Sequence, residues 1–167
     1  MEDPSKLPEI ELAAVMDIMT GLAQNAPTYA KQMVLEVYDY LMPGTRRTTY
    51  KTNIKNGRKA LGKKVILSWV VEGNYSGGFR VCYGTSEASI IAVDKVFYAL
   101  DGKGIPDGYR SPLVDAINTV DGGGYGQTEY FSFRACRNRN LHLEFKRMDL
   151  VRKINQIAGG QYGFIGD

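Results

Sequence analysis

Histidine and cysteine are scarce in this chain of 167 residues. Its only histidine is His142, and its two cysteines are Cys82 and Cys136. A structural zinc site usually takes about four Cys or His ligands, so these residues are too few and too scattered to form one. A catalytic unit that needs histidine could be built only around His142. We therefore expect no metal ion, no cofactor and two reduced thiols.

Long apolar runs are also absent. The longest stretch, VILSWVV at residues 65–71, is far shorter than the roughly 20 apolar residues that span a bilayer. The N-terminal sequence MEDPSKLPEIEL is acidic and lacks the apolar core of a signal peptide. Together these features predict a cytoplasmic protein without a membrane-spanning segment.

The sequence also lacks complete motifs for nucleotide hydrolysis and methyl transfer. GRKALGKK at residues 57–64 departs from the phosphate loop G-x-x-x-x-G-K-[ST] at Lys64, which replaces the hydroxyl that binds magnesium. A predicted strand follows this stretch, whereas in a phosphate loop a strand precedes it. No glycine-rich turn follows an apolar strand, and no Asp-Pro-Pro-Tyr type motif occurs. We predict that the protein is not an enzyme.

Charge is distributed unevenly, although the net charge is only +3. Residues 1–39 hold seven acidic and two basic residues, a net charge of −5. Residues 45–64 hold eight basic and no acidic residues. Clustered Lys and Arg gain from counterion release on phosphates, so this second segment is a candidate nucleic-acid-binding surface. A solvated linker, or a match to the acidic N-terminal helices, explains the same charge.

Two helices are predicted at the N-terminus. Apolar positions at helical spacing fall within residues 8–24 and again from Pro27 to about Met42. The sequence NAPT at residues 25–28 separates them. The expected organisation is a single domain over residues 1–167, with a helical hairpin (1–44), a basic connecting segment (45–64) and an α+β core (65–160).

The core pattern predicts two β-hairpins. KKVILSWVV and GGFRVCYG form the first hairpin across the polar turn EGNYSGG. QTEYFSFRAC and NLHLEFKR form the second across NRN, after the glycine-rich loop at residues 121–126. We expect an α+β fold in which these hairpins form an antiparallel sheet packed with helices, in the order ααββααββα.

Three helices complete this order. TSEASIIAVDKVFYAL begins with the capping residues Thr85 and Ser86. PLVDAINTV starts after Ser111 with a proline at its first position. MDLVRKINQIA is expected to stop at Gly159 and Gly160.

The second hairpin carries a pattern typical of metal-dependent nucleases. Such enzymes place Glu-x-Lys on one strand and another acid nearby, so that two carboxylates hold the metal ion. Glu144 and Lys146 have this spacing, and Asp107 or Glu129 could supply the second carboxylate. A cross-strand ion pair between Glu144 and Arg134, on the solvent face of an ordinary strand, explains the pattern equally well. We favour the solvent face and keep these residues as weak catalytic candidates.

A basic binding surface is the stronger candidate site. Lys and Arg would neutralise phosphates of DNA or RNA, while Tyr and Asn would stack on or hydrogen-bond to bases. An acidic protein surface would use the same residues. The residues assigned to this surface are Arg46, Arg47, Tyr50, Lys51, Asn53, Lys55, Arg58, Lys59, Lys63, Lys64, Arg134, Arg137, Arg139, Lys146 and Arg147.

Three stretches carry a family resemblance. YKTNIKNGRKALGKKVIL, RSPLVDAINT and TEYFSFRACRNRNLHLEFKRMDLVRKINQIAGG resemble an uncharacterised domain family of bacteria, phages and plasmids, over roughly residues 30–160. Members occur alone or attached to adenine-specific DNA methyltransferases. The resemblance implies a role near DNA modification, restriction and mobile elements, and it assigns no catalytic residue. This chain shows no methyltransferase domain, so we do not expect it to methylate DNA by itself.

Two classes of function fit these features. The first is a non-enzymatic binding protein of a phage or mobile element that contacts nucleic acid through its basic face. The second is a counter-defence inhibitor (anti-CRISPR or anti-restriction) that docks on a host nucleic-acid-processing protein complex. A steep dependence of affinity on salt favours the first class. The sequence does not identify the partner or the oligomeric state, and it leaves open whether the two hairpins share one sheet.

Overall fold

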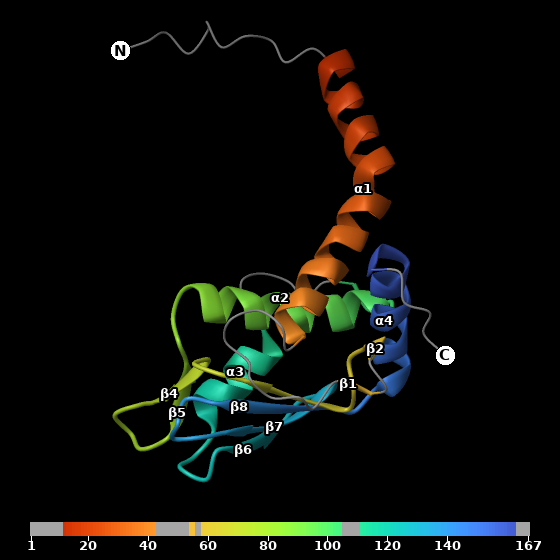
Figure 1. Cartoon of the computed structure of the whole chain (residues 1–167). Coiled ribbons are helices and arrows are strands. Elements are labelled where there is room, and N and C mark those ends of the chain that lie inside the picture. Colours follow the sequence, from red (N-terminus) through yellow and green to blue (C-terminus); the bar gives the residue numbers. More distant parts are fainter. Residues whose placement is uncertain (1–11, 43–53, 56–57, 105–110, 163–167) are drawn as a thin grey trace, which may run out of the picture. The chain divides into compact units, whose positions relative to one another are not determined.

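The computed structural model describes residues 12–42, 54–55, 58–104 and 111–162. They form an α+β fold in which helices accompany antiparallel sheets, as expected (Figure 1). The chain divides into two compact units, Met1–Gln32 and Met33–Asp167, and each is described by itself. Within the described ranges, no helix combines the length and the apolar character needed to cross a membrane.

Helix α1 (Leu12–Leu41) is continuous, so the predicted helical hairpin over residues 1–44 is wrong. Pro27 lies inside this helix. Because proline has no N–H, it leaves the carbonyl of Ala23 without its helical donor. Residues 23–32 are exposed, which lets water satisfy that carbonyl. The Asn25 side chain also donates to the Gly21 carbonyl (2.8 Å), and so bonds within the helix instead of ending it.

The second unit is built around a four-stranded antiparallel sheet with the order β3-β8-β7-β6. Its central hairpin is the second hairpin predicted from sequence, and the predicted glycine-rich loop contributes the start of the edge strand β6. The strands are β3 (Lys64–Leu67), β6 (Tyr125–Gln127), β7 (Phe131–Ala135) and β8 (Leu141–Phe145).

The first predicted hairpin is present in a shorter form and lies in a separate sheet. β4 (Val71–Gly73) pairs with β5 (Phe79–Val81). The single strand expected over residues 63–71 is interrupted because Trp69 adopts a φ of 62°, which no extended strand allows. Its first part, β3, pairs with β8 instead. The basic segment also contains a small unpredicted pair, β1 (Ile54–Lys55) with β2 (Arg58–Lys59).

Helices α2 and α3 follow the sequence expectations closely. α2 (Thr85–Leu100) has the predicted limits, but its N-cap is Gly84 and no side chain caps it, so the capping role expected of Thr85 and Ser86 is wrong. α3 (Pro112–Thr119) is capped by Ser111, whose side chain accepts from the Val114 N–H.

Helix α4 (Met148–Tyr162) continues past the glycines that were expected to end it. Gly159 is buried, and so is its neighbour Ala158. A small residue at this position lets the helix approach the core closely, so Gly159 serves packing and does not end the helix.

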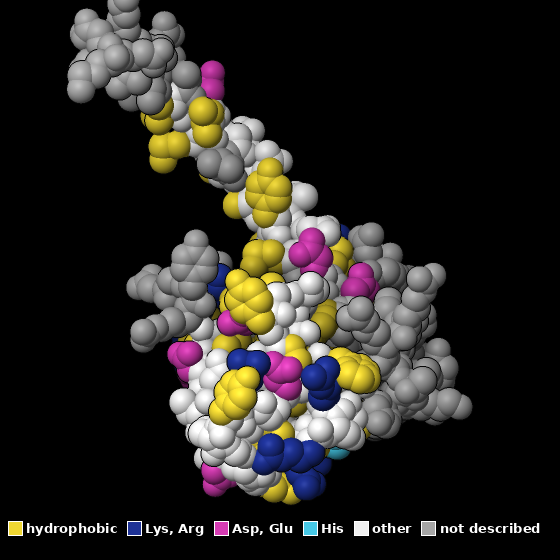
Figure 2. All heavy atoms as spheres, turned by 90° about the vertical axis from the view of Figure 1, so that its left-hand side faces the viewer, with side chains coloured by type: hydrophobic (Ala, Val, Ile, Leu, Met, Phe, Trp, Pro, Cys, Tyr) yellow, Lys and Arg dark blue, Asp and Glu magenta, His cyan; other side chains and the backbone are white. Residues whose placement is uncertain are grey.

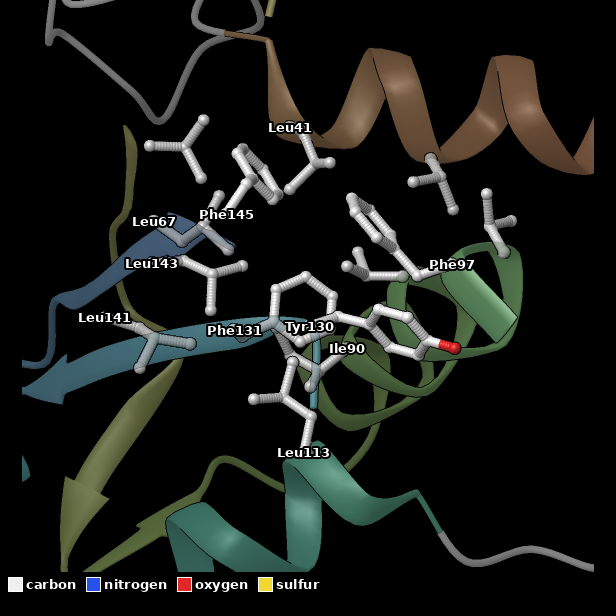
Figure 3. Close-up of a cluster of buried hydrophobic side chains, with 14 of the residues drawn as sticks. Leu41, Leu67, Ile90, Phe97, Leu113, Tyr130, Phe131, Leu141, Leu143 and Phe145 are labelled. Carbon is white, nitrogen blue, oxygen red and sulfur yellow. The ribbon is translucent and has the colours of Figure 1, made fainter. Parts of the chain in front are cut away.

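The core lies between the helices and one face of the four-stranded sheet (Figure 3). Leu141, Leu143 and Phe145 of β8 are buried, as their alternation predicted. The Phe97 ring of α2 stacks on the Phe145 ring with centroids 5.4 Å apart, and meets the Phe131 ring edge-on at 4.8 Å. α2 therefore covers this inner face of the sheet.

Buried polar contacts fix the helices to this core. Asp94 of α2 is 1% exposed and accepts hydrogen bonds from the Ser111 hydroxyl (2.7 Å) and the Leu113 N–H (3.0 Å) at the start of α3. Burial raises the pKa of Asp94 above its ordinary value, although these two bonds oppose the shift. The buried Tyr130 donates its hydroxyl to Asp101, just after α2 (2.8 Å).

Candidate nucleic-acid interface

The four-stranded sheet has a second face, which we call the open face. Side chains alternate between the two faces of a strand, so the strand register determines which residues share it. One row across the sheet runs Ile66, His142, Arg134 and Tyr125, and the next runs Lys64, Glu144, Ser132 and Gln127. Most of these side chains are exposed.

Glu144 is held by two lysines at one edge of the open face. Its carboxylate lies 2.9 Å from Lys63 Nζ and 3.0 Å from Lys64 Nζ. These hydrogen bonds hold the pKa of Glu144 below its ordinary value. The pairing with Arg134 that the hairpin pattern suggested is replaced, because β3 brings the lysines to the edge of β8.

His142 lies in the row next to that of Glu144. Arg134 is its partner on β7, and Lys64 lies one row away on β3. Partial burial lowers the pKa of His142 most, and the positive charges of Arg134 and Lys64 lower it further. The imidazole is therefore mainly neutral at pH 7, because its ordinary pKa is only about 6.5. A negatively charged ligand at this position would reverse that preference.

The other basic side chains of the open face lie toward β6. The Arg134 guanidinium lies 4.8 Å from the centroid of the Tyr125 ring, a cation–π contact. Lys146 donates to the Thr128 carbonyl (2.7 Å) and to the Gln127 side chain (3.4 Å). Tyr125, which is 65% exposed, was missed by the sequence analysis because it lay in a glycine-rich stretch interpreted as a loop.

A surface pocket of about 330 Å³ opens on this face. Its lining includes Lys64, Ile66, Tyr125, Arg134 and His142. This volume is at the lower end of the range for small-ligand sites, and suits a phosphate group or one base. Glu144 also lines the pocket, but lysine, arginine and a titratable histidine outnumber its one carboxylate, which gives the polar lining a basic character.

The nuclease pattern is not assembled by the residues that the structure describes. Glu144 is occupied by its two lysines, Lys146 turns toward β6, and Glu129 forms an ion pair with Lys103. Across the described ranges, no three His, Cys, Asp or Glu side chains gather as metal ligands would. Asp107 lies outside the described residues.

Most of the basic connecting segment also lies outside the described part of the chain. This holds for Arg46, Arg47, Tyr50, Lys51 and Asn53, and for the side chains of Lys55, Arg58 and Lys59. Lys63 and Lys64, at its end, lie on the open face as described above.

The structure divides the remaining predicted basic residues among three places. Arg134 and Lys146 lie on the open face. Arg137 and Arg139 lie in the β7–β8 turn, beside the β4–β5 hairpin. Arg147 is bound to Asp101 (3.0 Å) and Asp149 (2.7 Å), where it joins the end of α2 to the start of α4. Arg147 is therefore a structural residue in this arrangement.

These features define the class of protein: an α+β domain with helices on one face of an antiparallel sheet and a basic opposite face. The chain belongs to the family described as Domain of unknown function (DUF4942), whose profile matches residues 2–164. This membership agrees with the resemblance to an uncharacterised domain family. No curated protein and no solved structure matches the chain.

Proposed function

We propose that this protein is a non-enzymatic, cytoplasmic nucleic-acid-binding protein of a phage or mobile element, and that the open face contacts the phosphate backbone. The observation that carries the proposal is the charge of that face. Lys63, Lys64, Arg134 and Lys146 are opposed there by one acid, Glu144. Phosphates would gain the counterion-release free energy that such a surface provides.

The arrangement of the open face suits a polyanion. Arg134 and Lys64 lie on either side of β8, in successive rows of one sheet, so they can meet neighbouring phosphates. His142 lies between them and can add a third positive charge when a phosphate approaches. Tyr125 supplies an exposed ring beside Arg134 on which a base can stack.

Two further features support the proposal. The basic segment at residues 45–64 runs into β3, an edge strand of the same sheet, and holds six basic residues besides Lys63 and Lys64. The resemblance to domains attached to adenine-specific DNA methyltransferases would be consistent with such binding next to DNA modification. In that setting the domain would position modifying enzymes on DNA.

A counter-defence inhibitor is the alternative function. It would present the same basic side chains to the acidic surface of a host nucleic-acid-processing complex. The two functions differ in their response to random-sequence DNA, which the inhibitor would ignore.

The first test is the affinity for random-sequence duplex DNA over a salt series from about 50 to 200 mM. We expect the double variant Lys64→Gln/Arg134→Gln to bind more weakly, and the slope of log K against log salt to fall by about 0.9 for each lost phosphate contact. The matched control is Arg152→Gln/Lys153→Gln, which removes the same charge from α4.

Equal losses in both double variants would show that only net charge matters and would contradict a site on the open face. Absence of DNA binding by the unaltered protein, together with stoichiometric capture of a protein complex, would favour the inhibitor.

A further inference from the structure

Two residues with unusual backbone conformations face each other at one end of the β3–β8 pair. Among the residues that the structure describes, Trp69 (φ 62°) and Arg139 (φ 69°) are the two residues other than glycine with positive φ. A bulky side chain is rarely found in this left-handed region, because its Cβ crowds the backbone. Such strain persists only where the surrounding structure imposes it, and it is common at binding sites.

Backbone hydrogen bonds impose it here. The Arg139 carbonyl accepts from the N–H groups of Val70 (3.0 Å) and Val71 (3.4 Å), which follow Trp69. The Ser86 hydroxyl of α2 donates to the Trp69 carbonyl (3.4 Å). The backbone around Trp69 is thus attached to both the β7–β8 turn and α2.

Two large aromatic side chains near this turn are exposed to solvent. Trp69, the only tryptophan of the chain, is 61% exposed. Tyr83 is 95% exposed and follows Cys82, whose N–H donates to the Val70 carbonyl (2.8 Å). Because Val70 follows Trp69 and Cys82 precedes Tyr83, this hydrogen bond brings the backbones of Trp69 and Tyr83 near each other. Packing explains neither ring, because the core leaves both largely uncovered.

Three arginines lie at this turn and along the adjacent β4–β5 hairpin. The Arg139 guanidinium lies 5.2 Å from the Trp69 ring centroid, and Glu72 holds both Arg139 (3.5 Å) and Arg80 (2.7 Å). Arg137 lies over the Phe79 ring at 4.6 Å. Figure 2 faces this end of the second unit and shows basic side chains beside an acidic one, with exposed hydrophobic side chains around them. Three arginines against one glutamate leave the cluster positive.

We propose that this aromatic-arginine cluster (Trp69, Arg80, Tyr83, Arg137 and Arg139) binds unpaired nucleotides of single-stranded DNA or RNA. An exposed indole next to guanidinium groups matches a base next to its phosphates. A duplex would not use the indole, because its base faces are already stacked. The proposal deepens the proposed function: the cluster lies where the β3–β8 pairing ends, so one strand could run from the open face onto it.

The test uses the emission of Trp69, which reports on the cluster alone. The probes are oligothymidine of about 12 nucleotides and a duplex of the same length. We expect oligothymidine to quench Trp69 emission, and the duplex to leave it nearly unchanged. A conversion of Trp69 to Asn should weaken oligothymidine binding by roughly tenfold, the usual loss for one stacked base, and leave duplex binding unchanged.

Trp69→Asn also separates binding from folding, because asparagine tolerates the left-handed region. Its resistance to urea should equal or exceed that of the unaltered protein. Trp69→Phe, which keeps an aromatic ring, should retain most of the binding. Tyr75→Ala is the matched control, because Tyr75 is a fully exposed ring on the same hairpin but outside the cluster.

Two results would overturn this inference. One is oligothymidine binding that Trp69→Asn leaves unchanged, and the other is emission that responds to an oligoglutamate peptide instead of to oligothymidine. If duplex binding persists in either case, only the cluster proposal fails. If the unaltered protein binds neither nucleic acid, the proposed function fails as well.

Discussion

Gly126 shows how a single residue shapes the sheet. It lies on β6 opposite Phe133 of β7. A Cβ at this position would collide with the Phe133 ring, which therefore occupies the space that a side chain would need. The glycine lets the aromatic ring cover the edge of the sheet, and so supports the position of Tyr125 next to it on the open face.

We predict that Gly126→Ala destabilises the protein by about 1–3 kcal/mol, the usual cost of inserting atoms into a packed core. Urea unfolding, followed by far-UV circular dichroism, would measure this change. Gly123→Ala is the control, because the atom nearest to an added Cβ is one carboxylate oxygen of the exposed Asp121 at 3.1 Å, not a buried ring. Its effect should stay within about 0.5 kcal/mol. Equal stabilities of the two variants would contradict the assigned packing of Phe133.

For single residues, the sequence predicted which face of a strand a side chain lies on better than it predicted the ion-pair partners of that side chain. The alternation around His142 and Glu144 placed both residues on the outward face of β8, and the structure confirms this. The ion-pair partners of Glu144 were missed because Lys63 and Lys64 reach it only through the long-range pairing of β3 with β8. Alternation within one strand contains no information about which strand lies beside it.

Among the elements, those controlled by local signals were predicted best. α2 has the limits that its apolar periodicity indicated, and the start of α3 at Pro112, directly after Ser111, was correctly predicted. Both signals act within a few residues. α1 and α4 were predicted too short, because a proline and a glycine pair were treated as helix ends. Burial lets α4 continue through Gly159, whereas in the exposed stretch around Pro27 water satisfies the freed carbonyl.

Pro27 provides a prediction at the scale of one helix. Replacing it with alanine restores a backbone donor to the Ala23 carbonyl and removes the proline penalty of about 3 kcal/mol. We expect amide hydrogen exchange across residues 23–31 to slow in Pro27→Ala. Gly21→Ala, in the same helix and without close neighbours, should slow exchange less, in line with a gain of about 1 kcal/mol. Unchanged exchange in Pro27→Ala would contradict a continuous α1.

At the scale of the molecule, the α+β class was predicted and the sheet arrangement was not. Both hairpins exist, but they lie in separate sheets, because the strained turn at Trp69 divides the strand that would have joined them. A strand pairing between distant segments leaves little trace in one sequence, and a positive φ at tryptophan leaves none. The two candidate sites depend on these features. The pairing of β3 with β8 builds the open face, and the turn at Trp69 exposes the indole.

The most direct test of the open face is the pKa of His142, measured by NMR with and without duplex DNA. The chain has no other histidine, so the imidazole signal is unambiguous. In the free protein, burial and the charges of Arg134 and Lys64 hold the pKa of His142 below 6.5. A bound phosphate favours the protonated form, so the pKa of His142 should rise by about 1 unit or more.

The affinity for DNA should then increase as the pH falls from the pKa of His142 in the complex to its pKa in the free protein. The increase should reach about tenfold for each unit of difference between these two pKa values. A pKa that stays unchanged in saturating DNA, with no gain of affinity at lower pH, would contradict phosphate binding on this face.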